Sequence, residues 1–206
     1  MAARLAYHIT DVSNLPSILQ TGGLLSDARM QGALVTIIGY SHIKERRLTV
    51  AQVDCFPDRP FVGEFVPFYY CYRSVMLYTV NSGAVGRPAG CQKTILHLVT
   101  NTDALIAIGR QWAISDGNAS ASHTSFFSNV AALDQLNWEA INATYWAGQQ
   151  HQKCAEFLVK DFVPWSAISH IGCYDADTAA QVEAILGSVS ASHRPQVIVK
   201  PEWYYR

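Results

Sequence analysis

The chain has 206 residues, of which 50% are hydrophobic and 15% charged, and its formal net charge at pH 7 is −1. This composition excludes a disordered chain and suits a single domain over residues 1–206 with a sizeable core. The near-neutral charge argues against a protein that holds duplex DNA by bulk electrostatics, but it leaves room for a local basic groove that binds a short single strand.

The N-terminal part predicts a strand followed by a capped helix. Residues 7–10 predict a short strand, and residues 11–23 predict a helix in which Asp11 or Ser13 is the cap and Pro16 lies in the first turn. His8 would lie at the end of this strand, with its imidazole in the space that the following turn leaves open. A lone histidine at such a place is more often structural than functional.

The next part predicts a basic helix and an aromatic strand. Residues 41–48 predict a short helix, on which Arg46 or Arg47 either faces solvent or binds a phosphate through two parallel hydrogen bonds. Residues 65–71 predict a strand that Pro67 would restrict to an edge or an end of the sheet. Residues 74–80 fit a helix or a strand, and a helix with Ser74 as its cap is favoured.

The remaining segments mix strands and helices without a regular βαβ alternation, which indicates an α+β fold. The predicted strands are 94–99, 112–114, 168–174 and 195–199, the predicted helices are 103–108, 126–133 and 177–186, and the polar segment 115–120 predicts a loop.

The apolar run 152–162 predicts a central strand, with Glu156 at its front edge after a polar loop. A carboxylate at the mouth of a buried strand is costly unless it is solvated, paired or used in chemistry. An ordinary edge glutamate and a catalytic or ligand-binding carboxylate both fit this pattern.

Several site classes are excluded or disfavoured. The sequence contains no Gly-x-Gly-x-x-Gly after a strand, no Walker loop and no Gly-x-Ser-x-Gly. The five cysteines form no Cys-x-x-Cys pair, so we expect free thiols in a reducing cytoplasm and no zinc or other metal. The sequence has no apolar run long enough to span a membrane and no signal-peptide pattern, so we expect no membrane association.

Six stretches, taken in order, resemble the DarT family, the DNA ADP-ribosyltransferase toxins of bacterial DarT–DarG toxin–antitoxin systems. They are Tyr-His-Ile-Thr-Asp-Val-Ser at 7–13, Ser-His-Ile-Lys-Glu-Arg-Arg at 41–47, Val-Pro-Phe-Tyr-Tyr-Cys-Tyr at 66–72, Ile-Leu-His-Leu-Val at 95–99, Leu-Asn-Trp-Glu-Ala-Ile at 136–141 and Lys-Cys-Ala-Glu-Phe-Leu-Val at 153–159. The resemblance runs from His8 to Tyr205. One short motif would be weak, but six in order are specific.

The resemblance implies an ADP-ribosyltransferase fold, a split and mostly antiparallel sheet with helices around an NAD⁺ cleft. It implies transfer of ADP-ribose from NAD⁺ to a base in single-stranded DNA, with nicotinamide as the leaving group and no metal. Thymidine is the acceptor in most of the family and guanosine in one branch, and this chain looks more like the thymidine branch. The usual partner is a macrodomain antitoxin that removes the modification.

The resemblance also implies site residues. Glu156 matches the catalytic glutamate, and Arg47 matches the NAD⁺-binding arginine, with a part in catalysis. His8, together with Thr10 and Met76, is expected to bind NAD⁺. The segment 138–153 matches the target-binding region, which makes Tyr145, Trp146 and Lys153 the candidate DNA contacts. The segment 28–40 does not match the family pattern clearly.

Three alternatives stay open at this point. The chain could transfer ADP-ribose to guanosine, RNA or protein, it could hydrolyse NAD⁺ as a glycohydrolase, or it could be a non-catalytic nucleic-acid-binding module in which arginines and aromatic rings form a stacking groove. The carboxylate of Glu156 disfavours the last alternative.

Overall fold

The computed structural model of the chain describes residues 3–30, 36–189 and 193–206. Its strands are β1 (Leu5–Asp11), β2 (Gly23–Leu25), β3 (Phe65–Tyr69), β4 (Ile95–Asn101), β5 (Trp112–Asn118), β6 (Phe126–Phe127), β7 (Ala155–Lys160), β8 (Phe162–Pro164), β9 (His170–Cys173) and β10 (Gln196–Val199). Its helices are α1 (Leu15–Gln20), α2 (Ser41–Thr49), α3 (Val75–Asn81), α4 (Thr102–Ala107), α5 (Trp138–Asn142), α6 (Gln150–Lys153) and α7 (Ala176–Gly187). Over these described ranges, no helix has the length and apolar character needed to cross a membrane.

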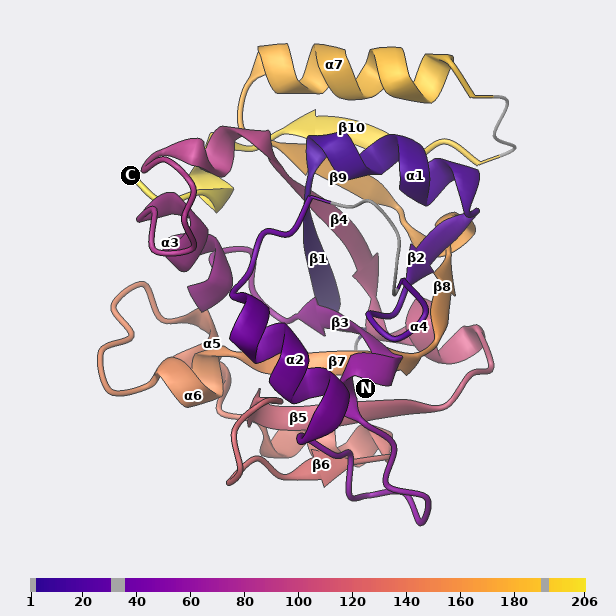
Figure 1. The fold of residues 1–206 in the computed structure, drawn as a ribbon, viewed down its shortest axis with the longest axis vertical. Coiled ribbons are helices and arrows are strands. Elements are labelled where there is room, and N and C mark those ends of the chain that lie inside the picture. Colours follow the sequence, from indigo (N-terminus) through magenta and orange to yellow (C-terminus); the bar gives the residue numbers. More distant parts are fainter. Residues whose placement is uncertain (1–2, 31–35, 190–192) are drawn as a thin grey trace.

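The strands form one large mixed sheet and one small ribbon. The large sheet has the order β10-β9-β4-β1-β3-β7-β5-β6, in which only the β9–β10 pair is parallel, and β2 pairs with β8 in a separate two-stranded sheet. Figure 1 shows α7 beside β10 at one end of the large sheet, and β5 and β6 at the other end. The arrangement confirms the predicted α+β fold with a mostly antiparallel sheet.

The sheet is split between its two central strands. β1 and β3 share a single pair, Tyr7 with Tyr69, whereas β1 and β4 pair along seven residues. Pro67 explains the opening. Its carbonyl oxygen accepts a hydrogen bond from His8 of β1, so this side of the residue faces β1. The N–H that proline lacks would point to the same side, and the ladder hydrogen bond that it would donate to β1 is therefore missing. The expectation that Pro67 restricts its strand to an edge is wrong, since β3 lies inside the sheet and the sheet itself opens at the proline.

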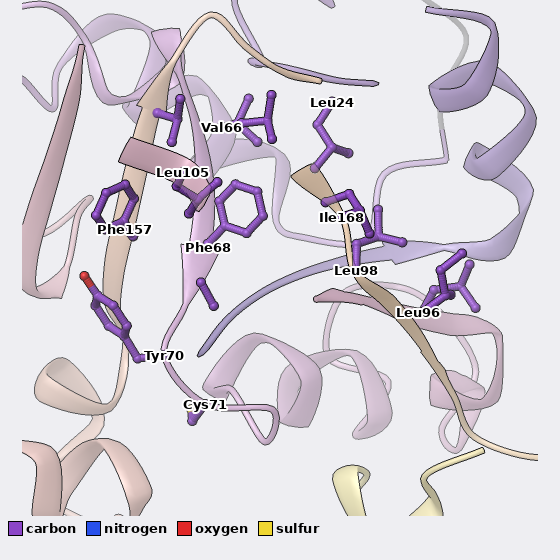
Figure 2. Close-up of a cluster of buried hydrophobic side chains, with 14 of the residues drawn as sticks. Leu24, Val66, Phe68, Tyr70, Cys71, Leu96, Leu98, Leu105, Phe157 and Ile168 are labelled. Carbon is purple, nitrogen blue, oxygen red and sulfur yellow. The ribbon is translucent and has the colours of Figure 1, made fainter. Parts of the chain in front are cut away.

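The main core lies on one face of the sheet, and strand alternation decides which side chains reach it. On β7, Phe157 and Val159 point into this core, whereas Glu156 and Leu158 point to the other face. Figure 2 shows part of the core, with Phe157 on β7 and Phe68 on the neighbouring strand β3. Fully burying a side chain of this kind stabilises a fold by about 1.5–3 kcal/mol.

The caps predicted for α3 and α4 are confirmed, whereas the predicted helix 11–23 is divided into a 3-10 segment, Val12–Asn14, which Asp11 caps, and α1. Asp11, Ser74 and Asn101 each accept a hydrogen bond from a backbone N–H in the first turn that follows them. Pro16 occupies the first turn of α1, where a missing N–H has no cost.

Three predicted segments differ in the structure. The polar segment 115–120 continues β5 as far as Asn118 rather than forming a loop, and the segment 126–133 forms the short strand β6 and a 3-10 helix instead of an α-helix. The run 152–162 is divided among the end of α6, β7 and β8, with Asp161 at φ 64° in the turn between the strands. In each case tertiary pairing decided the conformation over local propensity.

Candidate active site

A cavity of about 270 Å³ opens on the sheet where β1 and β3 separate. Its walls come from β1, the α1–β2 region, residues 36–47 and β3, with Met76 from α3. Small-molecule sites in proteins are typically about 300–1,000 Å³, so the volume of this cavity lies just below that range. The cavity wall includes polar and charged side chains that could bind a ligand, among them His8, Thr10, Asn14, Asp27, Arg29, Tyr40, Lys44, Arg47 and Tyr69.

His8 presents a neutral imidazole to the cavity. Its Nδ1 lies 2.9 Å from the carbonyl oxygen of Pro67, which can only accept, so Nδ1 carries the proton and Nε2 is left as an acceptor. Burial lowers the pKa of His8, which keeps the ring uncharged near neutral pH. The second predicted residue on this strand, Thr10, is buried, and its hydroxyl accepts a hydrogen bond from the side-chain amide of Asn14 at 3.1 Å.

Arg47 forms a bidentate ion pair with Glu156. Its two guanidinium nitrogens lie 3.1 and 3.0 Å from the two carboxylate oxygens, although the residues are 109 positions apart in the sequence. The arginine extends from α2, and its side chain is 11% exposed. Burial acts to lower the pKa of Arg47, but the facing carboxylate outweighs burial and raises that pKa above its ordinary value.

Glu156 is more deeply buried than its position in the sequence indicated. Its side chain is only 1% exposed, and it lies behind Arg47 and is not part of the cavity wall, whereas its strand neighbour Tyr69 is part of that wall. The Ala119 N–H approaches Oε1 at 3.4 Å. Of the two alternatives left open by the sequence, an ordinary edge glutamate fits less well, because the carboxylate is desolvated and paired with Arg47.

A buried ion pair is weak evidence for stability, because two apolar side chains of similar volume often stabilise a fold equally well. A charged pair that is held in a desolvated place beside a cavity is a candidate for a functional site. The Arg47–Glu156 pair is therefore the centre of the candidate site, and Met76 joins it from α3 as a wall residue.

The three predicted DNA contacts have different environments. Tyr145 is 93% exposed on the loop between α5 and α6. The neighbouring Trp146 packs edge-on against Tyr78 of α3, with ring centroids 5.4 Å apart. Lys153 is only 2% exposed and donates hydrogen bonds to the carbonyls of Ile141 and Ala143 at 3.0 and 2.8 Å.

These environments correct the assignment of Lys153. Its ammonium group is already used to hold the base of the loop, so it is not available to a nucleic acid. Of the three residues, Tyr145 is the one with a free ring, while Trp146 and Lys153 anchor the loop that carries it.

Some residues of the cavity wall, among them Lys44 and Tyr69, were not predicted from the sequence. Lys44 lies one turn before Arg47 on α2, and its Nζ pairs with Asp27 at 3.0 Å. The i, i+3 spacing of the two cations was the available signal, because residues at this spacing share one face of a helix. Tyr69 carried no signal beyond its place on an aromatic strand. Among the described residues, no group of three or more histidine, cysteine, aspartate or glutamate side chains could hold a metal ion.

Comparisons with known proteins agree on one family. The family model described as "ssDNA thymidine ADP-ribosyltransferase, DarT" matches residues 7–205. A protein of Thermus aquaticus named DNA ADP-ribosyl transferase is 39% identical over 202 residues, which cover 98% of this chain and 89% of that protein.

Two solved structures of the DarT of Thermus sp. 2.9 are similar over 98% of this chain. The complex with ADP-ribosylated single-stranded DNA has a TM-score of 0.92, 38% identity and 96% of its own chain covered. The complex with NAD⁺ has a TM-score of 0.87, 35% identity and 98% of its own chain covered.

Proposed function

This chain belongs to the DarT family, and from that premise we propose that it transfers ADP-ribose from NAD⁺ to a base of single-stranded DNA and releases nicotinamide. The family model and the two Thermus complexes, one with NAD⁺ and one with ADP-ribosylated DNA, support this activity. The observation in this chain that carries the proposal is the buried Arg47–Glu156 pair beside the cavity.

NAD⁺ would occupy the cavity between β1 and α2. The residues present fit such a ligand, because Arg47 offers a guanidinium to an anionic diphosphate, and His8 offers a neutral ring with a free acceptor nitrogen. Thr10 and Met76 would complete the binding surface. Since Glu156 is only 1% exposed, the ribose could reach its carboxylate only after Arg47 shifts toward the ligand.

The chemistry needs a held diphosphate, a carboxylate near the ribose and a positioned acceptor. The bond between C1′ of the ribose and the nicotinamide nitrogen breaks, and its electron pair leaves with nicotinamide. Glu156 would bind the ribose 2′-OH, oppose the positive charge that develops on the ribose and take the proton that the attacking base loses. General-base assistance of this kind is typically worth about 10² to 10⁴-fold.

The acceptor is expected to be a base in a single strand, because pairing hides its reactive edge in a duplex. A thymidine-containing oligonucleotide should be labelled from NAD⁺ when single-stranded, and labelling should nearly vanish after annealing to its complement. Incorporation of radiolabelled ADP-ribose into both forms at equal concentration measures this. Equal labelling of strand and duplex would contradict the proposal.

Tyr145 is the residue we propose to stack on a base. Tyr145→Ala should weaken use of the DNA about tenfold, since stacking of one base on an aromatic ring is worth about 1–3 kcal/mol. Thermal stability should not change, because the ring is 93% exposed. The matched control is Tyr145→Phe, which keeps the ring and should keep KM for DNA near the parent value; an unchanged KM in the alanine variant would remove Tyr145 from the site.

The acceptor base and the wider biology are also proposals. We place thymidine first, in line with the description of the family model, and guanosine, RNA, protein or water as acceptors would each give a different product. The activity would reside in one domain spanning residues 1–206, act in the cytoplasm as a toxin and be opposed by a macrodomain antitoxin. Arrest of bacterial growth on expression without that antitoxin is the expected phenotype.

A further inference from the structure

A bulge-like irregularity interrupts β5 directly opposite Glu156. In the ladder between β5 and β7, Ile114 pairs with Phe157, but the next pair joins Asn118 to Ala155. Three residues, 115–117, therefore lie opposite Glu156 alone. Bulges bend a strand and redirect side chains, and they are frequent beside active sites.

The side chain of Ser115 replaces the backbone acceptor that β5 would otherwise present to the Glu156 N–H. Its hydroxyl accepts a hydrogen bond from the Glu156 N–H at 3.0 Å and donates one to the carbonyl of Gly117 at 2.7 Å. The serine side chain is fully buried, so no solvent competes for either bond. The backbone of Glu156 is thus held by a side chain, whereas an ordinary antiparallel ladder would use a backbone carbonyl.

The side chain of His151, from α6, packs against the bulge. A Cβ on Gly117 would stand 2.2 Å from Nε2 of His151, so the α6 side chain packs directly on the bare glycine backbone. Just beyond the bulge, the Ala119 N–H approaches Oε1 of Glu156 at 3.4 Å. Ser115 of β5 therefore contacts the backbone of Glu156, and Ala119, the residue that follows β5, contacts its carboxylate.

We propose that Ser115 is a positioning residue, whose hydroxyl fixes the backbone of Glu156 at the bulge and thereby sets where its carboxylate stands relative to Arg47 and to the ribose of NAD⁺. This inference rests on the proposed function, because it assigns a second residue to the same reaction. Ser115 itself would not contact the substrate. A misplacement of about 1 Å in a catalytic group can cost about 10²-fold in rate.

The test compares Ser115→Ala with Ser115→Thr, which keeps the hydroxyl. In Ser115→Ala we expect kcat for nicotinamide release to fall between about 10- and 100-fold, with KM for NAD⁺ changed less than about threefold because the cavity wall is intact. Ser115→Thr should recover most of that loss. The matched control is Asn101→Ala, which also removes one side-chain acceptor of a backbone N–H, at the start of α4, and should keep the parent kcat.

A second readout does not depend on activity. Hydrogen exchange of the Glu156 amide should be at least about tenfold faster in Ser115→Ala than in the parent, and unchanged in Asn101→Ala. If Ser115→Ala does not fold, Ser115→Cys, with a similar size and a weak acceptor, should show the same loss of kcat.

The outcomes separate this inference from the proposed function. A parent protein that labels DNA together with a Ser115→Ala variant that keeps the parent kcat would overturn the positioning role and leave the function intact. A parent that neither cleaves NAD⁺ nor labels DNA would overturn the function, and the exchange rate of the Glu156 amide would then decide whether Ser115 holds that backbone.

Discussion

Replacing Glu156 with glutamine is expected to reduce DNA labelling by about 10² to 10⁴-fold, and further if charge stabilisation is lost as well. The amide keeps the shape of the side chain and can still accept a hydrogen bond from Arg47 and donate one to the ribose. It cannot accept the proton from the base, and it carries no charge to oppose the developing cation. Labelling and nicotinamide release by purified variants at equal folded fraction measure the effect.

The matched control for this variant is Glu64, whose partner Lys160 lies at the other end of the strand that carries Glu156. Glu64 pairs with Lys160 of β7 at 3.2 Å, and Glu64→Gln removes a carboxylate from an ion pair without touching the cavity. We expect it to keep the parent activity. If Glu156→Gln also keeps most of its activity, Glu156 only positions the ribose, and the base must be another group.

Replacing Arg47 with alanine should affect both activity and folding. kcat/KM for NAD⁺ should fall by roughly 10² or more, because the guanidinium proposed to hold the diphosphate is lost, and truncating one partner of a buried, hydrogen-bonded charge pair at a binding interface costs about 2–5 kcal/mol. The free energy of unfolding should fall by about 3–5 kcal/mol, because the Glu156 carboxylate is left buried without its partner. Steady-state kinetics and urea unfolding measure the two effects separately.

Two further variants separate the causes. Arg46→Ala removes the neighbouring arginine, which is exposed and donates to the Ser120 carbonyl at 2.7 Å, and it should have a much smaller effect on NAD⁺. The double variant Arg47→Met, Glu156→Gln removes both charges, so it should recover most of the lost stability while remaining inactive. A double variant with restored activity, or an Arg47→Ala variant with parent kinetics, would contradict the role of Arg47.

Local chemistry explains which parts of the fold could be predicted. The caps Ser74 and Asn101 act on residues next to them in the chain, so the sequence was sufficient to place the starts of α3 and α4. The bulge in β5 and the short strand β6 depend on pairing with distant strands, which no local pattern encodes.

The candidate site likewise contains residues that could be predicted from the sequence, in an arrangement that could not. The resemblance identified His8, Arg47 and Glu156, but their meeting depends on the sheet order β1-β3-β7 and on the position of α2. The burial of Glu156 and the internal bonds of Lys153 could not be inferred, because both depend on which segments cover them. A polar residue in a target-binding segment is as compatible with anchoring the loop as with contacting DNA.

The most direct test of the central claim is the mass of a DNA product. The purified protein is incubated with NAD⁺ and a thymidine-containing single strand, and the intact mass of the oligonucleotide is compared with the nicotinamide released. We predict a gain of one ADP-ribose per nicotinamide, carried on a base, and no gain with Glu156→Gln. Nicotinamide release without any gain in oligonucleotide mass would contradict the account and identify an enzyme that transfers ADP-ribose to water.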